Sequence, residues 1–106
     1  MKHERTKATE ISPKVKKIVW ERDNHACIYC MRYLPVQFAN SHFIKRSQGG
    51  LGIEQNIVTA CSKCHWKYDS TYQHSKMYEY TLNYLKSKYP DLKLENLVYN
   101  KYRKEE

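Results

Sequence analysis

The fold of this chain is decided by two short stretches, Cys27-Ile28-Tyr29-Cys30 and Cys61-Ser62-Lys63-Cys64, which together contain all four of its cysteines. A Cys-x-x-Cys turn brings two thiolates to one ion, and two such turns complete a tetrahedron of sulfur ligands. The spacing therefore predicts a structural zinc ion held by Cys27, Cys30, Cys61 and Cys64. The alternatives are disulfides, which a reducing compartment disfavours, and a thioredoxin-like redox pair, which would need only one motif.

The composition indicates why a small domain would need a metal. The chain has 106 residues, which is enough for one domain, and Leu, Ile, Val and Phe make up just under a fifth of it. Structural zinc can add about 10 kcal/mol or more to the folding free energy. Two Trp and ten Tyr supply further apolar contact area. We expect a group of aromatic side chains to lie in the core rather than to stack on bases: Trp66, Tyr68, Tyr72, Tyr78, Tyr80 and Tyr84.

The charge favours a polyanionic partner. Lys and Arg number 19 against 11 Asp and Glu, a formal net charge of +8, and zinc with four thiolates would lower it to about +6. No segment approaches the ~18 apolar residues of a membrane-spanning helix, and residues 1–10 carry no apolar signal segment. We therefore expect an intracellular, cytoplasmic protein that has no membrane partner. The positive charge leads us to expect that it binds nucleic acid.

The chain organisation follows from caps, breakers and periodicity. Ser12 and Pro13 predict the start of a helix that ends at Asp23-Asn24. Residues 1–10 are expected to form a basic flexible arm, residues 11–89 the domain, and residues 90–106 a tail that packs back through Leu92, Leu94, Leu97, Val98 and Tyr102. Within the domain we expect two arms of a hairpin at residues 34–43 and 57–60, an irregular loop at 45–54, and helices at 62–69 and 75–89.

The segment between and after the cysteine pairs resembles a known family. It reads Ser41-His42-Phe43-Ile44-Lys45-Arg46, then Gly49-Gly50, then Asn56-Ile57-Val58, and His65 follows the second pair. Their order and spacing, enclosed by the two zinc knuckles, resemble the HNH endonucleases over roughly residues 15–69. The resemblance implies an α+β fold with a zinc-stapled ββα-metal core and flanking helices. It also implies a metal-dependent DNA endonuclease that nicks one strand or cuts both, leaving 5′-phosphate and 3′-hydroxyl ends.

The resemblance implies a role for each site residue. His42 would be the general base, Asn56 would fix the loop and the His42 ring by hydrogen bonding, and His65 would bind a single catalytic divalent cation such as Mg²⁺, Mn²⁺, Ni²⁺ or Zn²⁺. Asp69 lies four residues after His65, so on a helix both side chains share a face and can bind the same ion. His74 is a weaker candidate ligand, and His3 and His25 are expected to be packed or surface residues.

One position departs from the family. The residue before the general base usually supplies a metal ligand, and here it is Ser41. A catalytically impaired, zinc-stabilised DNA-binding module is therefore the alternative function. Cations that flank the site could hold phosphates without reading sequence; they are Lys45, Arg46, Lys63 and Lys67. The resemblance is to small, stand-alone, phage-like members, which implies a bacterial or phage-encoded protein. A homodimer or a phage packaging partner stays open.

Overall fold

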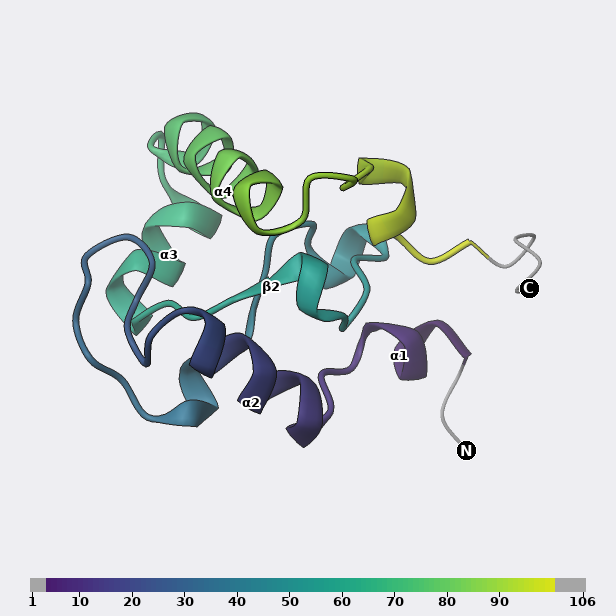
Figure 1. Cartoon of the computed structure of the whole chain (residues 1–106). Helices are drawn as coiled ribbons and strands as arrows, with labels where there is room; N and C mark the ends of the chain where they lie inside the picture. The colour runs from purple at the N-terminus through teal and green to yellow at the C-terminus, as the bar shows by residue number, and fades with distance from the viewer. Residues whose placement is uncertain (1–3, 101–106) are drawn as a thin grey trace.

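The computed structural model describes residues 4–100 and has an α+β fold. A two-stranded antiparallel sheet lies at the centre, between helices that are distant in sequence (Figure 1). The main elements are α1 (Glu4–Thr9), α2 (Pro13–Arg22), β1 (Ser41–His42), β2 (Ile57–Val58), α3 (Ser62–Ser70) and α4 (His74–Lys88). Short 3-10 turns lie at Val36–Phe38, Arg46–Gln48, Glu54–Asn56 and Leu94–Leu97.

Helix α2 forms where its caps predict. The Ser12 hydroxyl accepts a hydrogen bond from the Val15 amide at 3.1 Å, and Pro13 lies in the first turn, where its missing N–H costs no helical bond. Val19 is fully buried against Ala39 and Ile57. The helix therefore packs directly against the sheet.

The sheet is shorter than the sequence predicts. Ser41 pairs with Val58 and His42 with Ile57, and the Phe43 amide continues the ladder to the Asn56 carbonyl at 2.7 Å. The expected hairpin arm over residues 34–43 is wrong before residue 41, because Val36–Phe38 form a 3-10 turn instead. The extended Pro35 leads into this turn, and the Phe38 amide closes it by a 3.1 Å bond to the Pro35 carbonyl.

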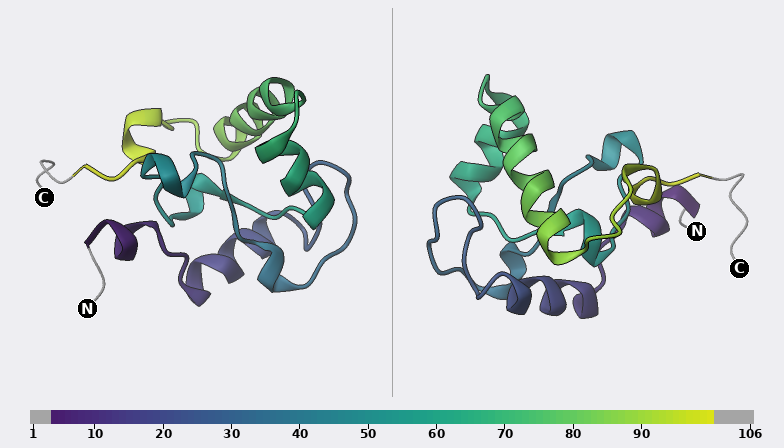
Figure 2. Two further views of the ribbon diagram at one scale, coloured as in Figure 1. Left: turned by 180° about the vertical axis from the view of Figure 1, so that it is seen from behind. Right: turned by 45° about the horizontal axis from the view of Figure 1, so that its top comes forward.

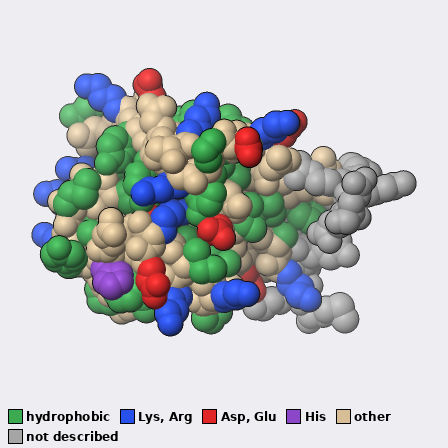
Figure 3. All heavy atoms as spheres, viewed as in Figure 1, with side chains coloured by type: hydrophobic (Ala, Val, Ile, Leu, Met, Phe, Trp, Pro, Cys, Tyr) green, Lys and Arg blue, Asp and Glu red, His purple; other side chains and the backbone are tan. Residues whose placement is uncertain are grey.

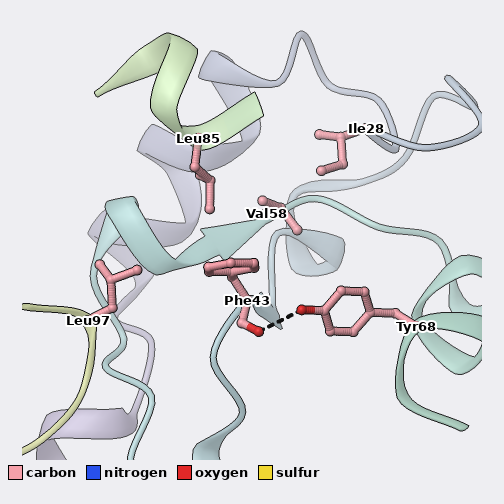
Figure 4. Close-up of a cluster of buried hydrophobic side chains, with 6 residues drawn as sticks. All are labelled: Ile28, Phe43, Val58, Tyr68, Leu85 and Leu97. Carbon is pink, nitrogen blue, oxygen red and sulfur yellow. Dashed lines mark hydrogen bonds between the residues drawn. The ribbon is translucent and has the colours of Figure 1, made fainter. Parts of the chain in front are cut away.

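Helix α3 is attached to β1 through the main hydrophobic cluster (Figure 4). Tyr68 is 4% exposed, and its hydroxyl donates to the Phe43 carbonyl at 2.8 Å. The buried members of the cluster are Ile28, Phe43, Val58, Tyr68, Leu85 and Leu97. Because Tyr68 precedes Asp69 and Phe43 follows His42, this contact holds the two site-bearing elements together.

Helices α3 and α4 are confirmed, but three of the aromatic side chains expected in the core lie on the surface. Tyr68 is buried, and Tyr78 and Tyr84 are partly buried against the same cluster. Trp66, Tyr72 and Tyr80 are 59%, 94% and 44% exposed, respectively. Helix α3 buries the face that carries Cys64 and Tyr68. Trp66, two residues from each, therefore points away from the core.

The N-terminal segment also differs from the flexible arm that we expected from the sequence. Glu4–Thr9 form helix α1, and Thr9 is 3% exposed. The Gly52 amide donates to the Ala8 carbonyl at 3.0 Å. A Cβ atom at Gly52 would lie 1.9 Å from the Glu10 carbonyl oxygen, so only glycine permits this close approach.

The C-terminal segment packs on the other side of the same loop. Leu97 is 1% exposed, its carbonyl accepts from the Leu51 amide at 2.8 Å, and the Tyr99 amide donates to the Gly49 carbonyl at 2.7 Å. Helix α1 and this segment lie at the same end of the molecule (Figures 1 and 2). His3, the rest of residues 1–3, Tyr102 and the end of the tail are outside the described residues.

Within residues 4–100, no helix is long and apolar enough to cross a membrane. On the face that Figure 3 shows, Lys and Arg side chains are scattered among acidic and hydrophobic ones and do not form one continuous patch.

Candidate active site

The four cysteine sulfurs converge as their spacing predicts. Their Sγ atoms all lie within 4.8 Å of one another. The Sγ atoms of Cys30 and Cys61 are 3.8 Å apart, far beyond the ~2.05 Å of a disulfide. Zinc–sulfur bonds of about 2.3 Å at tetrahedral angles require sulfurs about 3.8 Å apart. The cysteines are thus positioned to form a metal site, consistent with two zinc knuckles.

The electrostatics of this cluster favour a bound cation. Burial raises the pKa of Cys61, but hydrogen bonds from the Cys64 amide and from the neighbouring thiols outweigh it and lower that pKa to about 7. Burial, followed by the hydrogen bond with Cys61, raises the pKa of Cys64. Burial also raises the pKa of Cys27. The Cys61 thiolate therefore forms readily, whereas the thiols of Cys27 and Cys64 resist ionisation, and a soft divalent ion would stabilise their thiolates.

The predicted catalytic residues meet at a surface pocket of about 600 Å³. His42 comes from β1, and His65 and Asp69 come from α3. The pocket is lined by Glu10, Ile11, Lys16, Asn40, His42, Lys45, Arg46, Ser47, His65 and Asp69. The structure therefore brings together three candidate site residues that are up to 27 positions apart in the chain.

Two of the four predicted phosphate-binding cations line this pocket and two do not. Lys45 and Arg46 lie in its wall. Lys63 is exposed on α3 outside it, and Lys67 lines a separate hollow beside Cys30 and Cys64. Because Lys67 is two residues from both His65 and Asp69, it leaves the helix in a different direction.

His42 is held in a defined tautomer. Its Nε2 lies 2.8 Å from the Thr9 carbonyl oxygen, and a carbonyl can only accept a hydrogen bond. In the neutral ring Nε2 therefore carries the hydrogen, and Nδ1 has the free lone pair. Burial lowers the pKa of His42 below its ordinary value of 6.5, the charges of Arg46 and His65 lower it further, and the Thr9 bond opposes them. The ring is thus neutral at pH 7 and able to accept a proton.

Asn56 is fully buried and fixes the loop rather than the His42 ring. Its Oδ1 accepts from the Ile44 amide at 2.8 Å, and its Nδ2 donates to the carbonyls of Ile44 at 3.2 Å and Leu51 at 2.9 Å. The prediction that Asn56 hydrogen-bonds the His42 ring is therefore wrong. The Thr9 carbonyl instead accepts the hydrogen bond from the His42 ring, while the Asn56 side chain bonds to the backbone of Ile44 and Leu51.

His65 and Asp69 face each other, as their spacing on a helix predicts. The His65 Nε2 lies 3.0 Å from the Asp69 Oδ2, and the two side chains are 46% and 32% exposed. His65 Nδ1 lies 2.7 Å from the hydroxyl of Ser41, which is 6% exposed. His65 and Asp69 both line the pocket, and their side chains suit a divalent ion that keeps water and phosphate as its other ligands. Among the described residues, only the four cysteines form a compact group of three or more ligands.

His74 is committed to other contacts. Its Nδ1 lies 2.7 Å from the Tyr68 carbonyl, and its ring packs edge-on against Tyr68. It does not line the pocket. His74, the weaker candidate ligand, therefore belongs to the contact between helices α3 and α4.

Sequence reasoning missed the wall that the N-terminal segment provides. Thr9 bonds to His42, and Glu10, Ile11 and Lys16 line the pocket. No spacing rule could have found them, because these residues are more than 25 positions from His42 in the chain and reach the site by packing.

Comparison with known proteins gives one match. The HNH endonuclease family matches residues 27–71, which span both cysteine pairs, the two strands and helix α3. No curated protein and no solved structure matches the chain. The match begins at the first zinc knuckle, contains His42, Asn56, His65 and Asp69, and coincides with the sheet-and-helix unit that carries the pocket. Residues 27–71 of this protein therefore match the model of the HNH endonuclease family.

Proposed function

We propose that this protein is a metal-dependent DNA endonuclease in which His42 is the general base. The observation that carries the proposal is the pocket that combines the neutral, oriented ring of His42 with the facing pair His65 and Asp69. The proposed nuclease domain is residues 11–89, with 90–106 as a tail. Bound DNA is the proposed partner.

The chemistry assigned to His42 is proton removal from water. Its Nδ1 takes a proton while the water oxygen forms a bond to phosphorus. The bond between phosphorus and the 3′ oxygen breaks, which leaves a 5′-phosphate and a 3′-hydroxyl after the leaving oxygen takes up a proton. A ring that is neutral at pH 7 suits this step, since an imidazolium has no lone pair to offer.

His65 and Asp69 are the proposed holders of the catalytic ion. A divalent ion bound there would stabilise negative charge on the phosphoryl group and on the leaving oxygen. Ser41 would then not be a ligand. By accepting the Nδ1 hydrogen of His65, its hydroxyl would keep Nε2 unprotonated and directed toward Asp69, as the outer hydrogen-bond partners of metal-binding histidines do.

Three cations in the pocket wall are placed to receive phosphate groups. Lys45 and Arg46 follow β1, and Lys16 belongs to α2. Phosphate contacts of this kind position DNA without reading its sequence. Lys63 and Lys67 on α3 would contact the duplex beyond the pocket.

We propose that a structural zinc ion stabilises the fold of this domain and that its ligands are Cys27, Cys30, Cys61 and Cys64. Cys61 caps α3 and Cys64 lies in its first turn. The zinc site thus fixes the start of the helix that carries His65 and Asp69.

The test is incubation of supercoiled plasmid with the purified, zinc-loaded protein and Mg²⁺, Mn²⁺, Ni²⁺ or added Zn²⁺. We expect nicked or linear products with at least one ion and none with EDTA present, and ligase should reseal nicks that carry 5′-phosphate and 3′-hydroxyl ends. Failure to cut with all four ions, combined with salt-sensitive DNA binding, would instead favour the impaired binding module.

The single-turnover cleavage rate should depend on the protonation of His42. Because the pKa of His42 is lowered below 6.5, the reactive neutral form persists at mildly acidic pH. At saturating Mn²⁺ the rate should rise with pH, pass its midpoint below 6.5, and reach a plateau by pH 7. A midpoint at or above 6.5 would contradict this assignment.

Replacement of Ser41 tests its proposed role toward His65. Ser41→Ala removes the partner of His65 Nδ1 and should weaken Mn²⁺ binding by about 10- to 100-fold, the usual range for such partners. Titration followed by Mn²⁺ electron paramagnetic resonance measures this without any cleavage. Ser47→Ala, which removes a hydroxyl from the same pocket, is the matched control and should bind Mn²⁺ like the parent. Equal affinity in both variants would remove Ser41 from the metal site.

A further inference from the structure

Residues 8–10 are joined to the pocket by hydrogen bonds from two directions. The Thr9 carbonyl accepts from His42 Nε2 at 2.8 Å, and the Thr9 hydroxyl accepts from Arg46 Nε at 3.4 Å. The Ala8 carbonyl accepts from the Gly52 amide at 3.0 Å. Thr9 is 3% exposed. This segment is thus packed into the domain and is not an appendage.

These contacts are made by a part of the chain outside the family match. Thr9 is 33 positions from His42, and the match begins only at residue 27. The residues that follow, Glu10 and Ile11, line the pocket. The matched unit alone therefore has no acceptor for the His42 ring at this position, because the acceptor is a backbone carbonyl of Thr9.

The tautomer of His42 decides whether it can act as a base. A neutral imidazole carries its hydrogen on one of two nitrogens, and the hydrogen bond made by one nitrogen sets which. With the hydrogen on Nε2, Nδ1 can take a proton from water. With the hydrogen on Nδ1, this nitrogen is a donor and cannot accept a proton from water.

We propose that residues 8–10 are the positioning element of the active site, in which the Thr9 carbonyl holds the His42 hydrogen on Nε2 and so keeps Nδ1 free for the attacking water. This inference rests on the proposed function of His42. Thr9 is a positioning residue, since it touches the base and not the substrate.

Gly52 offers a way to move this segment by a substitution that lies outside the pocket lining. A Cβ atom there would lie 1.9 Å from the Glu10 carbonyl oxygen and 2.5 Å from the Glu10 carbonyl carbon. Both are backbone atoms, which cannot swing aside as a side chain does. Gly52→Ala should therefore separate residues 8–10 from the loop and weaken the bond between Thr9 and His42.

The experiment compares Gly52→Ala with the parent in two ways, with the structural zinc in place. Long-range ¹⁵N–¹H correlation spectra at pH 7.5 distinguish the protonated from the unprotonated nitrogen of the His42 ring. We expect a single Nε2–H form in the parent and a mixture of both forms in Gly52→Ala. The single-turnover cleavage rate should fall at least tenfold, but by no more than the ~10²–10⁴-fold contribution of a general base, while DNA affinity and zinc content stay unchanged.

Two further variants make the result decisive. Gln48→Ala changes an exposed side chain in the same loop and should match the parent. Thr9→Val keeps the shape of the side chain but removes its bond with Arg46, and should show the second tautomer to a smaller extent even if Gly52→Ala fails to fold. A parent ring with its hydrogen on Nδ1, or parent-like spectra in both altered variants, would overturn the proposal. A fixed Nε2–H form in a parent that cuts no DNA would instead overturn the proposed function and leave the positioning intact.

Discussion

Cys64→Ser is expected to remove bound zinc and with it the folded structure. Cys64 is 7% exposed, in the first turn of α3, and its sulfur is one of four that converge. Structural zinc can supply about 10 kcal/mol or more of folding free energy, whereas small domains are stable by only about 5–15 kcal/mol. Elemental analysis should find one zinc per parent chain and much less in the variant, and circular dichroism should show lost helix.

Ser62→Ala is the matched control for this prediction. Ser62 lies between Cys61 and Cys64 on the same helix, and its side chain is exposed. The control variant should keep its zinc and its helical signal. A monomeric Cys64→Ser protein that is folded without zinc would contradict two claims: that zinc stabilises the fold, and that the zinc site fixes the start of α3.

His42→Ala is expected to lower the single-turnover cleavage rate by about 10²–10⁴-fold, because it removes the proton acceptor. Zinc content should not change, since the ring is half-buried at the pocket and lies outside the cysteine cluster. DNA affinity should also persist, since the cations proposed to bind phosphate are retained. Fluorescence anisotropy with a labelled duplex measures that affinity independently of cleavage.

His25→Asn provides the control for loss of a histidine. His25 is exposed, stacks on Trp20 at a centroid distance of 3.6 Å, and does not line the pocket. Its φ of 62° lies in the left-handed region, which Asn tolerates. This variant should cut DNA at the parent rate.

The parts of the fold that the sequence predicts well are those set by neighbouring residues. The start of α2 follows from Ser12 and Pro13, and both act within one turn of the helix. The pairing of His65 with Asp69 follows from the pitch of α3. The convergence of the cysteines follows from the geometry of two short turns.

The failures concern residues whose surroundings are assembled from distant segments. Val36 and Phe38 favour a strand, yet they lie in a 3-10 turn that packs against α2, because tertiary contacts outweigh strand propensity. Composition predicts a core filled by aromatic residues, but the buried cluster is mostly aliphatic, with Phe43 and Tyr68 as its aromatic members, and composition cannot tell Tyr68 from Trp66. The two residues differ in their position on α3, because Tyr68 lies on its buried face and Trp66 does not.

The candidate active site shows the same contrast between local and distant residues. His42, His65 and Asp69 can be proposed from a local motif, whereas the acceptor of the His42 ring is the carbonyl of Thr9. Every residue has a backbone carbonyl, so the type of residue does not indicate which carbonyl accepts this hydrogen bond. The error of assigning that bond to Asn56 therefore could not have been avoided from the sequence.

The measurement that tests the central claim most directly is the single-turnover cleavage of one supercoiled plasmid by the parent, His42→Ala and His25→Asn at equal zinc content and saturating Mn²⁺. We expect the parent and His25→Asn to cut at the same rate, EDTA to stop both, and His42→Ala to be slower by about 10²-fold or more. Cleavage by His42→Ala at the parent rate would contradict the assignment of the general base and the mechanism built on it.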